Sequence, residues 1–169
     1  MKSIITLLLL ANSFLLGATP LYWSYVNRIT DKENTYLKKK YHLYLNTTGG
    51  GGMSCVKNIT QGYDAPCPTT IAAARGMIVE IIENLLRAIN ADTRLRPHLC
   101  EFPFTAKGLS LTLNFPENKS PTAPESQITL VLLIDQKIYY HYPMDVYATP
   151  YGTALVETFE EAKVALIKK

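Results

Sequence analysis

Residues 69–91 read TTIAAARGMIVEIIENLLRAINA, and this stretch decides the core of the fold. Apolar side chains recur here at the spacing of one helix face, while charged side chains fall on the opposite face. Thr69 or Thr70 can cap the first turn through its hydroxyl oxygen, and Glu83 and Arg87 stand four residues apart in the favourable order. The stretch therefore predicts a long amphipathic helix. Its apolar face comprises Ile71, Ala74, Ile78, Ile81, Ile82, Leu85 and Ile89.

The segments after this helix change to the two-residue period of β-strands. Residues 109–115 alternate apolar and polar side chains, which predicts a half-buried strand. Residues 128–134 are almost entirely apolar, as in a central strand, and residues 138–142 follow after a short turn. With a short strand within residues 53–60, these segments predict a three- to four-stranded, mainly antiparallel sheet.

Two further helices are predicted near the ends of the chain. Thr30 with Glu33, and Thr158 with Glu161, match the capping-box pattern that starts many helices. The first pattern predicts a helix over residues 31–45, and the second predicts a closing helix. The expected fold class is therefore α+β, with the sheet packed on one face by the long helix and with an N-terminal and a C-terminal helix.

The composition fits one ordinary globular domain. The chain has 169 residues, of which 47% are hydrophobic and 18% are charged, as in folded domains with one core. Its 17 basic and 14 acidic residues give a formal net charge of +3. This balance supplies no strong field for nucleic acid, so no nucleic-acid partner is expected.

The first 18 residues resemble an export signal. Lys2 precedes an apolar run over residues 4–18 that ends in the small residues Gly17 and Ala18. The run is shorter than the roughly 20 apolar residues that span a bilayer. We therefore predict a signal peptide over residues 1–18, a single α+β domain over residues 19–169, and a periplasmic or secreted location.

Retention of this segment as an uncleaved anchor is the alternative, because Leu16 breaks the small-x-small cleavage pattern. Tyr22, Trp23 and Tyr25 would then lie at the level of the lipid headgroups, where aromatic rings with a polar edge are favoured. Contact with a membrane is expected only in this case.

Export would permit disulfides among the three cysteines, Cys55, Cys67 and Cys100. Cys55 and Cys67 flank a short segment and are the favoured disulfide candidates. In the alternative, all three thiols are reduced, and Cys100 is a small buried apolar residue.

Two groups of residues are candidates for interaction with a partner. Four consecutive glycines form either a hinge or an exposed backbone surface, because they lack side chains that could pack. Tyrosine is enriched at interfaces. In the strand over residues 138–142, Tyr139 and His141 are expected on the face opposite to that of Ile138. The candidate interaction residues are Gly49, Gly50, Gly51, Gly52, Tyr139 and His141.

Arg75 is the one charged residue on the apolar face of the long helix. Either its guanidinium extends past the start of the helix to water, or it forms an ion pair with a carboxylate from a loop. Such a pair would order the chain and would take no part in chemistry. Arg75 is therefore a candidate for a structural ion pair.

No motif of a known catalytic chemistry occurs in the chain. A cysteine nucleophile needs an imidazole within reach, and Cys100 with His98 or His141 is the one combination worth considering. His98 and Cys100 offer two metal ligands, whereas a structural zinc site takes four. We therefore expect no metal and no cofactor, and a small cysteine-dependent hydrolase remains the alternative function.

Several different short motifs, spread from residue 49 to residue 162, together form a pattern. They are Gly49 to Met53, Ala74-Arg75, Leu85-Leu86 with Ile89-Asn90, Leu95-Arg96-Pro97 with Leu99, Pro103-Phe104-Thr105, Lys137-Ile138 with Tyr140, and Glu157 to Ala162. This pattern resembles a family of small exported proteins of chlamydia-like bacteria that has no assigned activity. The resemblance implies a bacterial, exported protein and transfers no catalytic residue.

The sequence thus predicts an exported, non-catalytic α+β domain. Its expected partner is a protein or a component of the cell envelope, which it would bind through the sheet face or the glycine run.

Overall fold

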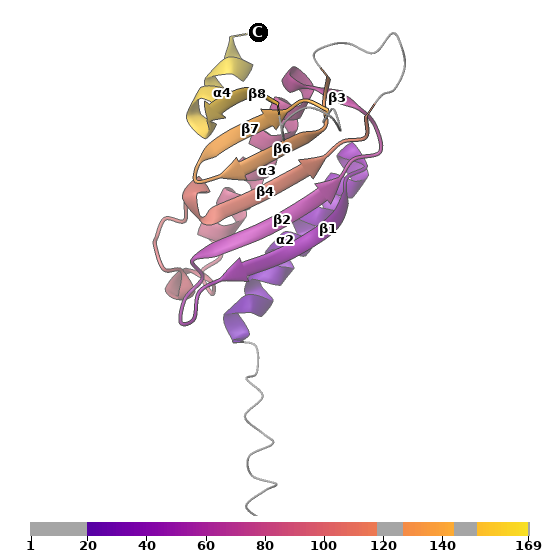
Figure 1. Cartoon of the computed structure of the whole chain (residues 1–169). Helices are drawn as coiled ribbons and strands as arrows, with labels where there is room; N and C mark the ends of the chain where they lie inside the picture. Colours follow the sequence, from indigo (N-terminus) through magenta and orange to yellow (C-terminus); the bar gives the residue numbers. More distant parts are fainter. Residues whose placement is uncertain (1–19, 118–126, 144–151, 169) are drawn as a thin grey trace, which may run out of the picture.

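A computed structural model describes residues 20–117, 127–143 and 152–168 of the chain. The predicted signal peptide, residues 1–18, lies outside the described residues. Within them the fold is α+β, with three α-helices and a mainly antiparallel six-stranded sheet (Figure 1).

The helices are α2 (Leu21–Tyr41), α3 (Ile71–Ala91) and α4 (Phe159–Ile167). The long helix predicted from residues 69–91 is confirmed as α3, and the hydroxyl of Thr70 accepts a hydrogen bond from the Ala73 N–H at its start. The capping box of Thr158 and Glu161 is also confirmed, because both of its reciprocal hydrogen bonds are present at the start of α4.

The main sheet has the strand order β1-β2-β4-β6-β7-β8. Only β2 and β4 run parallel, and the other neighbours are antiparallel. A separate pair of short strands, β3 and β5, lies beside it. The strands are β1 (Tyr44–Gly51), β2 (Asn58–Asp64), β3 (Thr69–Thr70), β4 (Leu109–Asn114), β5 (Gln127–Ile128), β6 (Leu130–Ile134), β7 (Lys137–His141) and β8 (Thr153–Thr158), and the 3₁₀ turns are η2 (Arg96–His98) and η3 (Ala106–Gly108).

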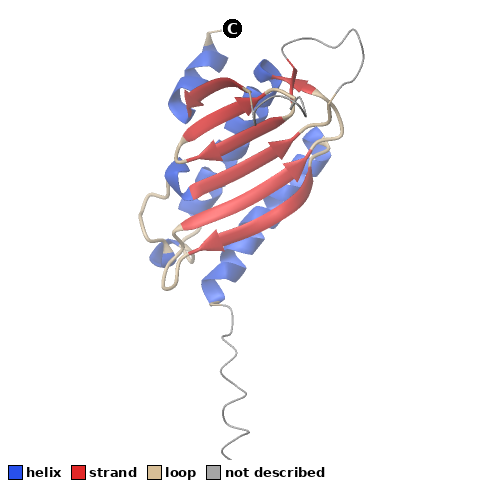
Figure 2. Ribbon diagram, viewed as in Figure 1, coloured by secondary structure: helices blue, strands red, loops and turns tan. Residues whose placement is uncertain are grey.

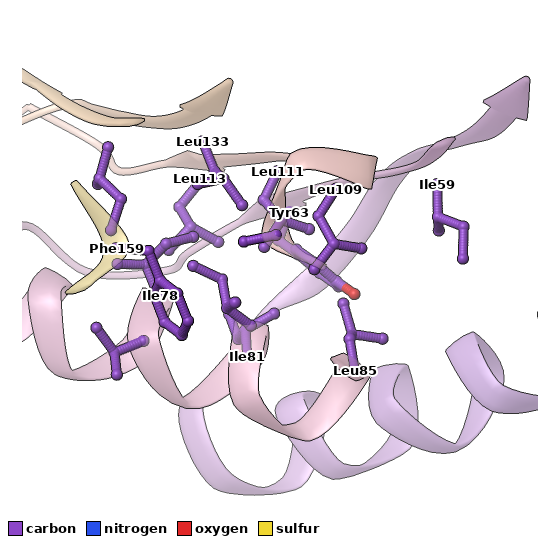
Figure 3. Packing of buried hydrophobic residues seen from close by; sticks show 14 of the residues in the cluster. Ile59, Tyr63, Ile78, Ile81, Leu85, Leu109, Leu111, Leu113, Leu133 and Phe159 are labelled. Atoms are coloured by element: carbon purple, nitrogen blue, oxygen red, sulfur yellow. The ribbon is translucent and has the colours of Figure 1, made fainter. Parts of the chain in front are cut away.

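All three described helices lie on one side of this sheet (Figure 2). The core lies between the two layers, and it buries alternate residues of β4 with the apolar face of α3. Ile78, Ile81 and Leu85 of α3 point into the space next to the sheet (Figure 3). The opposite face of the sheet has no described helix over it.

Two expectations about the fold are wrong. The sheet has six strands and not three or four, because β1 and β8 join its two edges. The first helix runs from Leu21 to Tyr41 and not over residues 31–45, since Tyr22, Val26 and Ile29 continue its buried face and Tyr44 already belongs to β1. The hydroxyl of Thr30 bonds to the Asn27 carbonyl at 3.0 Å inside this helix and therefore caps nothing.

Candidate functional site

The face of the sheet away from the helices carries an apolar area on three neighbouring strands. On β6 the buried Val131 and Leu133 alternate with residues that lie on the opposite face. Ile134 and Val156 are 51% and 46% exposed there, although both side chains are large and apolar. We call this area the open-face patch; it comprises Leu130, Leu132, Ile134, Tyr139, His141 and Val156.

Strand register brings the members of the patch together. Tyr139 of β7 pairs with Leu132 of β6 on one side and with Val156 of β8 on the other. His141 pairs with Leu130 in the same way. Directly opposed residues on one face of a sheet have Cβ atoms about 5 Å apart. The patch is therefore one continuous surface of side chains.

The half of this face nearer β1 has a different character. Thr112 and Asn114 of β4 lie beside Leu132 and Leu130, and Thr60 of β2 lies beside Ser110. These are small or polar side chains, so the apolar surface ends at β4. The open-face patch is a bounded area and not a general property of the sheet.

Tyr139 and His141 both lie in the patch. Their rings stack with centroids 6.5 Å apart and an interplanar angle of 9°. Burial lowers the pKa of His141 below its ordinary value of 6.5, so the imidazole is mostly neutral at pH 7. Tyr139 is partly exposed, whereas His141 is buried at 8% exposure, so Tyr139 supplies the aromatic surface of the patch and the neutral His141 ring supports it from beside.

The glycine run is part of a strand, and it is neither a hinge nor a free loop. Gly49, Gly50 and Gly51 form the end of edge strand β1. The Trp23 ring of α2 lies where a Cβ on Gly50 would stand, and the Asn58 side chain occupies the same place at Gly51. Gly52 follows with a φ of 129°, which favours glycine. The glycines therefore give room for side chains that pack on this strand.

Arg75 forms a bidentate ion pair within the fold. Its Nε and Nη2 donate to the Glu157 carboxylate of β8 at 2.7 and 2.9 Å. The buried Tyr140 hydroxyl donates to the same carboxylate at 2.7 Å. The carboxylate belongs to a strand and not to a loop, in contrast to the expectation from sequence. This cluster ties α3 to β7 and β8.

The predicted Cys55–Cys67 disulfide is wrong. Cys55 is bonded to Cys100, which is 45 residues away, and Cys67 is an exposed free cysteine. Backbone hydrogen bonds explain why Cys55 is bonded to Cys100. The Val56 N–H donates to the His98 carbonyl and the Cys100 N–H donates to the Val56 carbonyl, which brings the two chain segments together. Sequence spacing alone contains no sign of this pairing.

The disulfide also removes the thiol that a cysteine nucleophile would need. Catalysis by Cys100 requires a thiolate, and the sulfur is committed to Cys55. His98 lies in η2 and stacks on Tyr22 at 5.4 Å, while His141 lies on β7. The residues proposed for the hydrolase do not form a nucleophile and base pair.

A cleft of about 490 Å³ lies beside the disulfide. Its volume is in the range of small-molecule sites. The Asn90 side chain positions Phe104 on its wall, since Nδ2 donates to the Phe104 carbonyl at 2.9 Å and the Phe104 N–H donates back at 2.7 Å. The lining includes Gly52, Lys57, Cys100, Glu101, Phe104 and Lys107.

Some members of the open-face patch are not evident from the sequence. The run over residues 128–134 predicts a strand covered on both faces, whereas the helices cover only one. Its side chains alternate between the two faces of the sheet, but both sets of side chains are apolar, so the pattern does not show which face is exposed.

Among the described residues, no group of three or more histidine, cysteine or acidic side chains is placed to hold a metal ion. No helix of the described residues has the length and apolar character to cross a membrane.

Comparisons with protein-family models, with curated proteins and with solved structures found no match for this chain.

Proposed function

We propose that this protein is an exported, non-catalytic binding module that contacts a protein partner through the open-face patch. The observation that carries the proposal is the exposure of large apolar side chains on one bounded half of an otherwise polar sheet face. Exposed apolar areas rimmed by polar residues are typical of sites for other macromolecules.

The position of the patch suits such a contact. Leu132 and Tyr139 belong to β6 and β7, which are paired on both sides and therefore hold their side chains rigidly. A rigid surface loses little conformational entropy when it binds. The partly exposed Tyr139 ring, which stacks on the buried His141, supplies aromatic area, which is enriched in interface cores.

Export is supported by two features that differ in kind. The apolar run over residues 4–18 matches a signal segment, and the disulfide between Cys55 and Cys100 is of the sort that persists in oxidising compartments. An origin in a chlamydia-like bacterium, as the resemblance implies, would put the partner in the periplasm or elsewhere in the envelope.

Site-specific photocrosslinking tests the proposal. A benzophenone amino acid replaces Tyr139 or Leu132 in cells that express the full chain, and Thr60 on the polar half of the same face is the matched control position. We expect an adduct of one defined mass from positions 139 and 132 and none from position 60.

The variant Val156→Glu provides the second arm, because it places a charge in the patch next to Tyr139. It should remove the adduct from position 139 while leaving the thermal unfolding midpoint near that of the parent. Equal adducts from positions 60 and 139, or none from positions 132 and 139, would contradict the proposed function.

A further inference from the structure

Three apolar side chains from separate segments are exposed at the end of the molecule where α2 begins. Leu21 at the start of α2 is 71% exposed, and Phe102 after η2 is 52% exposed. Met53, in the turn between β1 and β2, is fully exposed. The start of α2 and the β1–β2 turn lie at the same end of the molecule (Figure 1). We call this the basal end.

Specific contacts join these three segments. The Tyr22 hydroxyl donates to the Met53 carbonyl at 3.4 Å, and the Tyr22 ring stacks on His98 with centroids 5.4 Å apart. The disulfide between Cys55 and Cys100 then links the region of the β1–β2 turn to the segment after η2. The exposed apolar side chains are therefore carried on one connected platform.

Cationic side chains surround this platform and contact its aromatic rings. The Arg96 guanidinium lies 4.5 Å from the centre of the Phe102 ring, and that of Arg94 lies 5.4 Å from the centre of the Tyr25 ring. Lys57 and Lys107 are exposed on the walls of the adjacent cleft. Exposed apolar side chains surrounded by aromatic rings and cationic side chains are typical of protein surfaces that bind at the membrane interface.

The acidic groups nearby do not cancel this charge. Asp92 is half-buried, and its carboxylate binds Arg28 at 2.6 Å and Arg94 at 3.4 Å. Glu101 is the acidic residue in the lining of the cleft, which also includes the two basic residues Lys57 and Lys107. Excess positive charge beside exposed apolar side chains complements an anionic lipid surface.

The described part of the chain begins at the same end of the molecule. The apolar run over residues 4–18 directly precedes α2, and the chain enters α2 at Leu21 in the basal end. We propose that the basal end docks on the surface of an anionic bilayer, with Leu21, Met53 and Phe102 among the headgroups and the cations against lipid phosphates. This docking does not rest on the proposed function, because it uses none of the open-face patch.

Fluorescence from a single tryptophan can test the docking in the full chain. Trp23 is the sole tryptophan, so the substitution Trp23→Phe removes the tryptophan fluorescence of the parent chain. Phe102→Trp then reports the basal end, and Tyr44→Trp is the matched control at the far end of the eight-residue strand β1. The chains are reconstituted in phosphatidylcholine vesicles that contain phosphatidylglycerol and brominated lipid.

Docking predicts a blue-shifted emission at position 102 and quenching about threefold stronger than at position 44, because only docked side chains reach the brominated layer. Met53→Trp is a second reporter at a fully exposed position, so it does not depend on repacking around Phe102. Equal quenching at positions 44, 53 and 102 would show that residues 1–19 merely tether the domain, and would overturn the proposal.

A charge test separates docking on anionic lipid from apolar contact alone. The double variant Lys57→Gln/Lys107→Gln should reduce quenching at position 102 by about half, because it removes two of the cations that face the headgroups. Lys39→Gln/Lys168→Gln makes the same change in charge at exposed positions elsewhere and should have no effect. Identical quenching in the two double variants would rule out recognition of anionic lipid.

Discussion

At the scale of single residues, the carboxylate of Glu157 holds three parts of the fold together. It accepts hydrogen bonds from Arg75 of α3 and from Tyr140 of β7, and it belongs to β8 itself. The hydrogen bonds to Glu157 raise the pKa of Arg75, so the guanidinium stays charged. Burial raises the pKa of Tyr140, and the Glu157 charge adds to this effect, so the phenol stays protonated and can donate. Both charged partners are mostly buried, and neither can be removed without leaving the other unpaired.

Glu157→Gln should therefore lower the free energy of unfolding by roughly 2–3 kcal/mol, because the Arg75 charge would lose its counter-ion in a mostly buried place. Tyr140→Phe removes one hydrogen bond from the same carboxylate and should cost only about 1 kcal/mol. Urea unfolding monitored by circular dichroism compares the two. A larger loss in Tyr140→Phe than in Glu157→Gln would mean that packing, and not the ion pair, stabilises this cluster.

Gly50 and Gly76 show that the space around a glycine decides whether an added Cβ destabilises or stabilises the fold. Gly50→Ala would place a Cβ within the Trp23 ring and should destabilise the fold by roughly 1–3 kcal/mol, since the ring or the strand must shift. At Gly76 of α3, a Cβ would meet no atom within 4 Å. Gly76→Ala should thus stabilise the protein by about 0.5–1 kcal/mol, as expected for a helix interior. The midpoints of urea unfolding should move in opposite directions, and a neutral Gly50→Ala would disprove the packing role.

At the scale of secondary-structure elements, α2 and α3 are joined by a cluster around Glu80. Its carboxylate accepts hydrogen bonds from Lys40 at 2.5 and 2.7 Å, from Tyr41 at 2.5 Å and from Tyr36. Burial by itself would raise the pKa of Glu80, but the hydrogen bonds from these three side chains outweigh burial and lower it to about 2. The cluster therefore favours the charged carboxylate.

This depressed pKa gives a pH dependence of known sign. The Glu80 carboxylate takes up a proton near pH 4.5 in the unfolded chain but only near pH 2 in the folded chain. The stabilisation that the ionised carboxylate gives the fold is therefore complete above about pH 5 and is lost as the pH falls from 5 to 2. Glu80→Gln should lower the thermal midpoint at pH 7 by about 2–4 °C and flatten its decline between pH 5 and pH 2.

Glu83→Gln, at an exposed position on the same helix, is the control, and it should keep the parental slope between pH 5 and pH 2. Differential scanning calorimetry at several pH values gives both curves. If Glu80→Gln and Glu83→Gln decline alike, the cluster does not couple α2 to α3 in solution.

At the scale of the whole molecule, the disulfide fastens the β1–β2 hairpin to the segment that follows α3. Because the two cysteines are 45 residues apart, the bond closes a long loop of the unfolded chain. In the chain-entropy model this closure contributes about 3–4 kcal/mol. It also fixes one wall of the cleft and the platform of the basal end.

Cys55→Ser/Cys100→Ser should lower the free energy of unfolding by about 3–4 kcal/mol, and dithiothreitol should have the same effect on the parent protein. Cys67→Ser should change nothing, because that cysteine is free and exposed. Guanidinium unfolding with and without the reductant gives the comparison. Peptide mapping that linked Cys55 to Cys67 would contradict the pairing described above.

Local sequence patterns are enough to predict those parts of the fold that depend on neighbouring residues. The period of residues 69–91 and the Thr70 hydroxyl specify α3, and the Thr158 and Glu161 side chains specify the start of α4, because helix faces and caps involve residues three or four positions apart. The alternation in residues 109–115 indicated β4 for the same reason. The α+β class follows from these local patterns.

How the helices and strands meet depends on contacts between residues far apart in the chain. The glycine-rich β1 lacks the alternation of a strand, and it becomes one because β2 pairs with it and Trp23 packs on its bare backbone. The partners of Cys55 and of Arg75 lie 45 and 82 residues away, and no local pattern encodes contacts across such distances. The open-face patch exists for the same reason, since which face of β6 is covered depends on where the three described helices pack.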